Sequence, residues 1–386
     1  MRSKMFYFIT LFWGVLFAFS CEQDPLSSTP GEAELFESQE LLKVEHGRSQ
    51  VKVMTWNIYV GANVDAVLEA TDPEQIPLLV ATAYQELLST NFNERAQTIA
   101  QFIKKHRPNL IGLQEVSLIQ RYSSLPPAPG SLIEQFDYLQ ILLDKLASFG
   151  LNYQVAGQVN NADVVVPRLA DPLTFEFDYV RLLDSDVVLA HQNVEISNVV
   201  TANYQAALPV PDLGIAIPRG YVAVNARVGQ KTYRFVNTHL ESFTDQVRLP
   251  QAQELAAALA GETLPIILVG DFNTLAPTPL DPDGGITYQF LTKDAGYMDI
   301  WPHNRFRREG EGFTASHDSD LRDVVPNLTK RIDLVFVRNH NIRHSSESVS
   351  FGPVQAVVRG DELNERTSSG MWPSDHAGIF ARLHIR

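Results

Sequence analysis

The sequence predicts one α/β domain with mixed sheets over residues 51–386. Short apolar runs typical of buried strands alternate with stretches whose apolar residues recur at helical spacing. Some strands follow one another through hairpin turns, whereas others are separated by helices, so both antiparallel and parallel neighbours are expected. No linker interrupts this pattern, and it therefore indicates a single domain.

The expected elements follow in chain order. Strands are expected at 51–58, 110–116, 153–159, 186–191, 194–200, 264–270, 331–338 and 376–386. The segment 221–242 is typical of a β-hairpin that turns at Gly229 and Gln230. Helices are expected at 93–109, 133–150 and 247–261. Residues 120–132 and 160–180 contain proline and are expected to be long loops.

Composition limits the classes of function. The chain has 386 residues, of which 45% are hydrophobic and 20% charged, as in ordinary globular proteins. Its formal net charge of −14 argues against a general basic groove for nucleic acid. A nuclease is not excluded, because a bound divalent cation can offset negative charge at the site itself.

The N-terminal segment predicts export. Residues 1–20 carry Arg2 and Lys4 before an apolar run that is short for a membrane span but typical of a signal peptide. The chain's only cysteine, Cys21, follows, an arrangement that resembles a bacterial lipoprotein signal with a lipidated cysteine. Residues 21–48 would then be a lipidated, flexible tether, and the protein would lie at the cell envelope, on the outer membrane or the cell surface. The alternative is an ordinary cleaved signal with an incidental cysteine.

Polar residues end many of the apolar runs. Such runs end at Asn57, Glu115, His239, Asp271 and Asn273, while Asp333 lies inside one, and Asp375 and His376 stand just before the last strand. One such residue alone is usually a turn or a cap. Because sheet folds gather strand ends at one crevice, so many of them together predict a site.

The residue types at these positions indicate a chemistry. Carboxylate and amide oxygens without thiolates suit a hard cation such as Mg²⁺ or Mn²⁺. The two histidines can serve as general base and general acid. Sequence patterns of serine hydrolases, zinc proteases, P-loops and dinucleotide-binding folds are not found. Metal-assisted attack of water on a phosphate ester fits this inventory best.

The order of the motifs "TWNI", "LQEV", "NTHLES", "GDFNT", "RIDLVFV" and "SDHAGI" resembles the endonuclease/exonuclease/phosphatase superfamily. Within the superfamily, the residues of these motifs are most similar to the deoxyribonuclease I-like and neutral sphingomyelinase-like branch. The resemblance covers the domain at 49–386 and implies a four-layer sandwich, in which two mixed β-sheets pack face to face with helices on the outside. It also implies hydrolysis of phosphoric esters. The protein is expected to be a monomer.

The resemblance assigns expected roles to two groups of residues. For the metal, Glu115 matches the principal Mg²⁺ ligand, Asn57 a position that touches the metal or the phosphate, and Asp375 a second contact to the metal or to water. The residues expected to carry out the chemistry are His239, Asp271, Asn273, Asp333 and His376.

Each catalytic position has its own expected task. Asp271 would position or deprotonate the attacking water, and Asn273 would donate to a phosphate oxygen. His376 would contact the phosphate while Asp333 orients its ring. His239 would face the leaving oxygen. We expect Asp186 rather than Asp184 to orient His239, although a turn at the start of a strand explains Asp186 equally well.

The sequence leaves the substrate open. The segment 300–313 concentrates cations and aromatic residues, including Trp301 and Arg305, and could contact a phosphate backbone, a membrane interface or only solvent. The leading expectation is a Mg²⁺-dependent nuclease that cuts DNA or RNA. The alternative is a phosphodiesterase or phosphatase for phospholipid head groups or inositol phosphates. A non-catalytic surface protein with the same fold is the third possibility.

Overall fold

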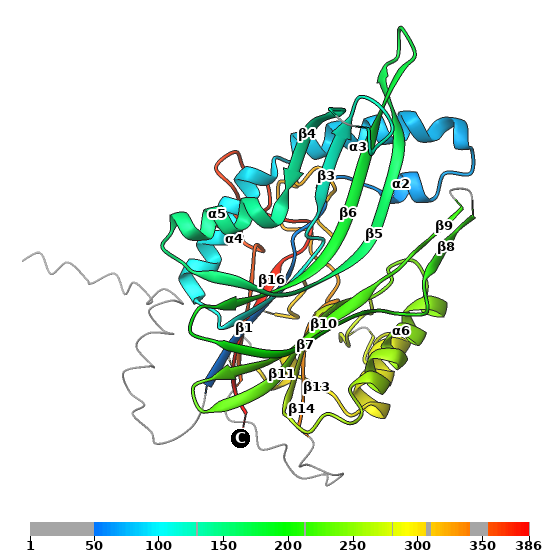
Figure 1. Ribbon diagram of the computed structural model, residues 1–386. Helices are drawn as coiled ribbons and strands as arrows, with labels where there is room; N and C mark the ends of the chain where they lie inside the picture. Colours follow the sequence, from blue (N-terminus) through cyan, green and yellow to red (C-terminus); the bar gives the residue numbers. More distant parts are fainter. Residues whose placement is uncertain are drawn as a thin grey trace, which may run out of the picture. The chain divides into compact units, whose positions relative to one another are not determined.

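The computed structural model describes residues 50–128, 130–211, 214–279, 281–305, 310–339 and 354–385. Residues 1–49, which include the expected signal peptide, Cys21 and the tether, lie outside the described residues. Figure 1 shows two β-sheets with helices on their outer faces.

The larger sheet has the strand order β15-β16-β1-β2-β6-β3-β4, with β5 paired to β6. Its strands β1 and β2 are parallel, whereas the remaining neighbours are antiparallel, so the sheet is mixed. The strand bounds are β1 Gln50–Asn57, β2 Leu110–Gln114, β3 Leu118–Tyr122, β4 Leu132–Asp137, β5 Tyr153–Asp171, β6 Glu176–His191, β15 Gln355–Arg359 and β16 Gly378–His384.

The smaller sheet has the order β13-β14-β12-β11-β10-β7, and only β11 and β12 are parallel among its described pairs. Its strand bounds are β7 Glu195–Asn203, β10 Gly220–Val228, β11 Lys231–His239, β12 Ile266–Asp271, β13 Met298–Asp299 and β14 Asp333–Arg338. A separate short hairpin pairs β8 Leu208–Val210 with β9 Ile215–Ile217.

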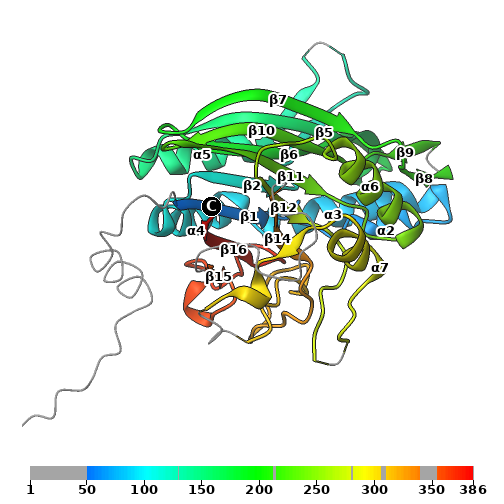
Figure 2. The same ribbon diagram turned by 90° about the horizontal axis from the view of Figure 1, so that it is seen from below.

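The two sheets pack face to face through inward-facing apolar side chains such as Val53, Val188, Phe235 and Val269. Figure 2 shows β1 and β2 of the larger sheet beside β11, β12 and β14 of the smaller one. The face-to-face arrangement that the resemblance implied is therefore present.

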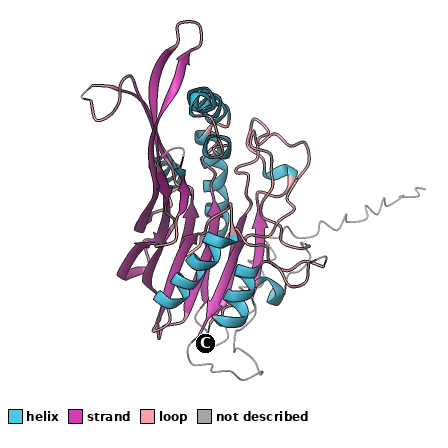
Figure 3. Cartoon of the chain, turned by 90° about the vertical axis from the view of Figure 1, so that its right-hand side faces the viewer, coloured by secondary structure: helices cyan, strands magenta, loops and turns pink. Residues whose placement is uncertain are grey.

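Helices cover the outer face of each sheet, as Figure 3 shows. Side chains of α3, α4 and α5 pack with Trp56 and Leu113 on the larger sheet, and those of α6 and α7 pack with Val236 and Phe336 on the smaller one. The helix bounds are α2 Asp65–Leu68, α3 Ile76–Ser89, α4 Phe92–His106, α5 Tyr138–Ser148, α6 Asp245–Ala258 and α7 Ile286–Gln289. Among the described helices, none is both long enough and apolar enough to span a membrane.

Several local expectations were wrong. The segment 160–180 is not a loop, because β5 and β6 form a long hairpin across it, closed by the turn at 172–175. The alternation of apolar and polar residues along β5 is weak, because much of this strand is only partly buried. The expected helix at 133–150 begins only at Tyr138, because the preceding residues form the edge strand β4 and Asp137 caps the helix by accepting from the Gln140 N–H.

The segment 300–313 also differs from expectation. Trp301 is only 5% exposed and packs in the core between the sheets, so its side chain is not available to a phosphate backbone or a membrane. Residues 306–309 lie outside the described residues.

Candidate active site

Gly270 lets β12 deliver Asp271 to the site. Its φ of +150° belongs to a region that side chains rarely tolerate, and a β-carbon there would lie 1.9 Å from the Thr238 carbonyl oxygen on β11. The close approach sets the ends of β11 and β12 side by side, with His239 opposite Asp271 in the parallel register. Asp333 lies opposite Asp271 on the other neighbour, β14.

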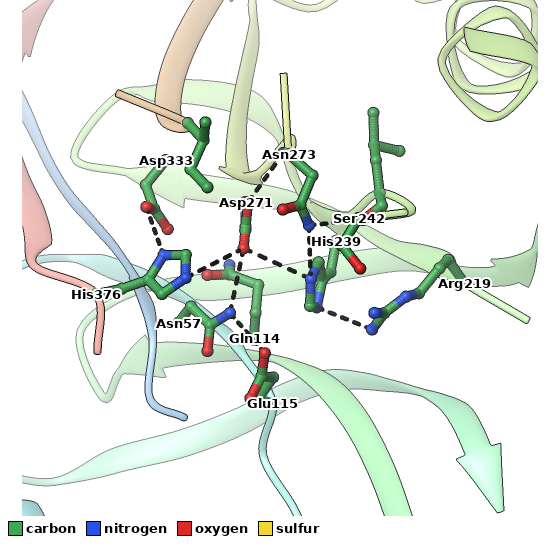
Figure 4. Close-up of polar contacts among 12 residues, drawn as sticks. Asn57, Gln114, Glu115, Arg219, His239, Ser242, Asp271, Asn273, Asp333 and His376 are labelled. Carbon is green, nitrogen blue, oxygen red and sulfur yellow. Dashed lines mark hydrogen bonds and ion pairs between the residues drawn. The ribbon is translucent and has the colours of Figure 1, made fainter. Parts of the chain in front are cut away.

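The Asp271 carboxylate is the centre of the cluster in Figure 4. Its Oδ2 lies 3.2 Å from Asn57 Nδ2, 3.5 Å from His239 Nε2 and 3.8 Å from His376 Nε2. Its Oδ1 accepts the Asn273 backbone N–H at 2.9 Å. Burial, followed by the nearby Asp333, raises the pKa of Asp271 to about 6. This carboxylate can therefore exchange a proton close to neutral pH.

His376 and Asp333, which the resemblance pairs, are in direct contact. His376 Nδ1 lies 2.8 Å from Asp333 Oδ2, and the Asp333 backbone N–H donates to Thr314 Oγ1. Burial alone would lower the pKa of His376, but Asp333, Asp375 and Asp271 together raise it well above its usual value. The imidazolium form is therefore favoured, with Nε2 facing Asp271.

Glu115 and Asn57 lie beside this pair. Glu115 Oε1 accepts Asn57 Nδ2–H at 2.9 Å, and Oε2 accepts the Val60 backbone N–H at 2.8 Å. Burial, together with Asp375 and Asp184, raises the pKa of Glu115 to about 7. The cost of ionising Glu115 shows that this corner of the site would gain from a cation.

Two groups of side chains at the site carry atoms that a divalent metal can bind, and the second is also close enough together to hold one. The predicted ligands Glu115 and Asp375 offer the carboxylate oxygens that Mg²⁺ prefers. The amide oxygen of Asn57 already accepts the Tyr59 backbone N–H at 3.0 Å, and its Nδ2 faces the carboxylates, so Asn57 bridges them as a donor.

The second group is Asp271, Asp333 and His376, all buried, whose possible ligand atoms lie within 4.8 Å of one another. The donor chemistry is therefore compatible with a metal, although the direct Asp333–His376 bond already satisfies two of those groups. Which residues ligate the metal stays a prediction.

His239 has an unexpected neighbour. Its Nδ1 lies 3.1 Å from Arg219 Nη1 but 4.0 Å from Asp186 Oδ1, the carboxylate that the sequence assigned to it. Asn161 Nδ2 lies within hydrogen-bond distance of both Asp184 and Asp186, at 3.1 and 3.0 Å. The orienting role of Asp186 therefore stays a prediction, whereas Arg219 makes the closer contact.

Sequence reasoning missed Arg219, although a signal for it was present. A two-residue turn at Gly229 and Gln230 places residue 220 opposite residue 239, which is the observed register of β10 and β11. Arg219 precedes Gly220 and therefore lies next to His239.

Asn273 completes the cluster. It adopts a left-handed φ of 49°, and its Nδ2 donates to the Leu240 carbonyl at 2.9 Å while lying 3.1 Å from His239 Nε2. The structure thus brings Asn57, Glu115, His239, Asp271, Asn273, Asp333 and His376 into one connected network. Asp375 is close enough to influence the pKa of Glu115 and of His376.

Residues 54–376 match the Endonuclease/Exonuclease/phosphatase family. The chain belongs to this family. Its members are phosphoric ester hydrolases, and the two mixed sheets with outer helices are the family's fold. The motifs singled out from the sequence all lie within or at the edges of the matched range.

Two solved structures agree with this chain in fold at low sequence identity. A family protein from Bacteroides thetaiotaomicron is 16% identical with a TM-score of 0.52, covering 88% of this chain and 100% of that one. One from Leptotrichia buccalis is 15% identical with a TM-score of 0.51, covering 86% and 99%. A truncated TDP2 from Caenorhabditis elegans is 15% identical with a TM-score of 0.46, covering 87% and 98%. No curated protein matches the chain.

Proposed function

We propose that this family member is a Mg²⁺-dependent phosphodiesterase of the cell envelope that acts as a nuclease on DNA or RNA. The observation that carries the proposal is the position of Asp271, a carboxylate with a near-neutral pKa between two histidines. A base and a cationic donor meet there, and Asn57 links Asp271 to the carboxylate of Glu115, an arrangement that suits metal-assisted hydrolysis of a phosphodiester.

The residues divide the reaction among them. Asp271 takes the proton of the attacking water, and the imidazolium of His376, held by Asp333, binds the phosphate through Nε2. Asn273 donates to a phosphate oxygen, and His239 lies beside Asn273 and faces the same oxygen. Glu115 and Asp375 would hold the cation, which when bound supplies positive charge against the phosphate.

A lipid substrate is the second candidate, because one observation favours it. The turn of the β5–β6 hairpin, which extends beyond the other strands in Figure 1, exposes apolar side chains. Leu173 is 90% exposed, Phe175 71% and Phe177 50%. Such a tip suits a membrane surface, which would place phospholipid head groups near the enzyme.

Plasmid nicking tests the main proposal. The purified protein is incubated with supercoiled plasmid and Mg²⁺, in parallel with EDTA, with the variant His376→Ala and with His191→Ala. His191 lies at the far end of β6 and is a matched control for loss of a histidine. We expect nicking by the native protein and by His191→Ala, and none in the other two reactions.

The other outcomes select between the candidates. Hydrolysis of bis(4-nitrophenyl) phosphate without nicking would keep the chemistry and reject the nuclease. Phosphatidylcholine and sphingomyelin vesicles would then test the lipid candidate. Inactivity toward all of these substrates with Mg²⁺ and Mn²⁺ would contradict both candidates and favour a non-catalytic binding role.

A further inference from the structure

The contact between Arg219 and His239 sets the position of the histidine's proton. Arg219 Nη1 lies 3.1 Å from His239 Nδ1. A guanidinium has only donors and stays charged in proteins, so the ring nitrogen it faces must be the acceptor. The proton of a neutral His239 is then on Nε2, the nitrogen that faces the reaction centre (Figure 4).

We propose that Arg219 is a positioning residue that holds His239 as the neutral Nε2–H tautomer, so that His239 and Asn273 form a pair of donors for one phosphate oxygen. This inference rests on the proposed function for its substrate, although the tautomer itself can be measured without any reaction. It assigns to His239 the opposite state from His376, whose Nδ1 faces a carboxylate.

The carboxylates near His239 do not compete with Arg219. Asp186 Oδ1 is 4.0 Å from Nδ1, beyond hydrogen-bond distance, and its Oδ2 accepts from Asn161 Nδ2 at 3.0 Å. Burial, followed by Asp184, raises the pKa of Asp186 well above its usual value, which favours the uncharged acid. Asp184 Oδ2 lies 3.5 Å from Arg219 Nη1 and serves as the counter-charge that keeps the guanidinium in place.

The other ring nitrogen meets a second donor. Asn273 Nδ2 lies 3.1 Å from His239 Nε2, and the Leu240 carbonyl fixes the direction of the amide by accepting from Nδ2 at 2.9 Å. With the proton on Nε2, two N–H groups lie side by side, an unfavourable contact unless an oxygen accepts from both. A phosphate oxygen placed there relieves the contact and is stabilised as charge develops on it.

The charged groups around the ring agree with a neutral His239. Four charged or titratable groups face the His239 ring. They are Arg219 from the chain before β10, Asp186 from β6, Asp271 from β12 and His376 from the chain before β16. Burial, Arg219 and His376 all lower the pKa of His239 well below its usual value.

Nitrogen NMR tests the tautomer directly. The full chain is labelled with ¹⁵N on histidine, and long-range ¹H–¹⁵N spectra are recorded near neutral pH with and without Mg²⁺. The His239→Gln variant assigns the signals. We expect His239 to carry its proton on Nε2 in the native protein and in Arg219→Lys, which keeps a charged donor.

Arg219→Met removes the donor and should move the proton to Nδ1 or give the imidazolium. Arg227→Met, an exposed arginine farther along β10, is the matched control and should leave the His239 signals unchanged. A native Nδ1–H tautomer, or an Nε2–H tautomer that persists in Arg219→Met, would overturn the proposal. Should Arg219→Met not fold by circular dichroism, Arg219→Leu, which also lacks a donor, takes its place in the same comparison.

Binding of inorganic phosphate gives the second readout. We expect phosphate to shift the His239 Nε2 signal in the native protein and in Arg219→Lys, but not in Arg219→Met. If a phosphodiester substrate is found, Arg219→Met should lower kcat on the order of 100-fold, as loss of an oxyanion donor does. An inactive native protein with the expected tautomer would contradict the proposed function and leave the role of Arg219 intact.

Discussion

At the scale of single residues, the two histidines of the site differ through their Nδ1 partners. His376 faces the carboxylate of Asp333, whereas His239 faces the guanidinium of Arg219. A carboxylate stabilises the imidazolium form and a guanidinium disfavours it, so the His376 ring is cationic and the His239 ring is neutral. The site thus holds one cationic donor and one neutral donor on either side of Asp271.

Replacing Asp333, the partner of His376, should weaken the action of His376 as a cationic donor. In Asp333→Asn the ring loses its counter-charge, so the pKa of His376 falls and its imidazolium is depleted at neutral pH. We expect kcat to fall by about 10²- to 10³-fold, the range for general acid–base groups. Asp323→Asn is the matched control, because Asp323 pairs with His317 at 3.1 Å outside the network. Equal losses in both variants would contradict the specific role of Asp333.

Asp271 should lower the stability of the folded protein at neutral pH. Its pKa is about 6 in the folded protein, above the ordinary value of 3.8, so the folded state binds the proton of Asp271 more tightly than the unfolded state does. The contribution of Asp271 to stability therefore falls as pH rises from 4 to 6. We expect metal-free Asp271→Asn to be more stable than the native protein at pH 7, on the order of 2 kcal/mol, and to lose this gain near pH 4.

Urea unfolding at pH 4 and pH 7 measures the difference in stability between Asp271→Asn and the native protein. Asp271→Asn should also be inactive. Because Asp271 acts as a base, native activity should rise with pH through about 6. A variant whose stability relative to the native protein did not change between pH 4 and pH 7 would contradict the raised pKa.

At the scale of elements, the ends of β11 and β12 depend on one glycine. Gly270→Ala should distort the β11–β12 pairing, because the added carbon would lie 1.9 Å from the Thr238 carbonyl oxygen. We expect Gly270→Ala to lower the free energy of unfolding by several kcal/mol, at least about 3, and to abolish activity by moving Asp271. Gly261→Ala is the control, since a β-carbon at Gly261 meets no atom within 4 Å. Thermal unfolding of both variants provides the comparison, and similar Tm values would contradict the argument.

The elements also show which sequence patterns predict structure well. The β10–β11 hairpin and β12 were expected because their apolar runs are buried on both faces. The β5–β6 hairpin was not, because it is only partly buried along β5 and its pattern resembles that of a loop. The helix α3 was not expected either, although Ile76, Val80, Tyr84 and Leu87 form a buried stripe.

At the scale of the whole molecule, we propose that the protein is an exported lipoprotein anchored through Cys21, which lies outside the described residues. In cells, Cys21→Ser should shift the protein from the membrane fraction to the soluble fraction, because a serine cannot receive the lipid. Ser20→Thr, a change beside the cysteine, should leave most of the protein in the membrane fraction. Fractionation with an antibody measures both, and a native protein found wholly in the soluble fraction would contradict the anchor.

The sequence by itself determined the class of fold and the inventory of the site. Buried strands require continuous apolar runs. Polar residues at the ends of these strands can be recognised in the sequence because they interrupt the runs. The tertiary structure decided which groups face which. Arg219 rather than Asp186 makes the closer contact with His239, and Asn57 bridges two carboxylates, because side-chain direction and the packing of strands from both sheets decide these contacts.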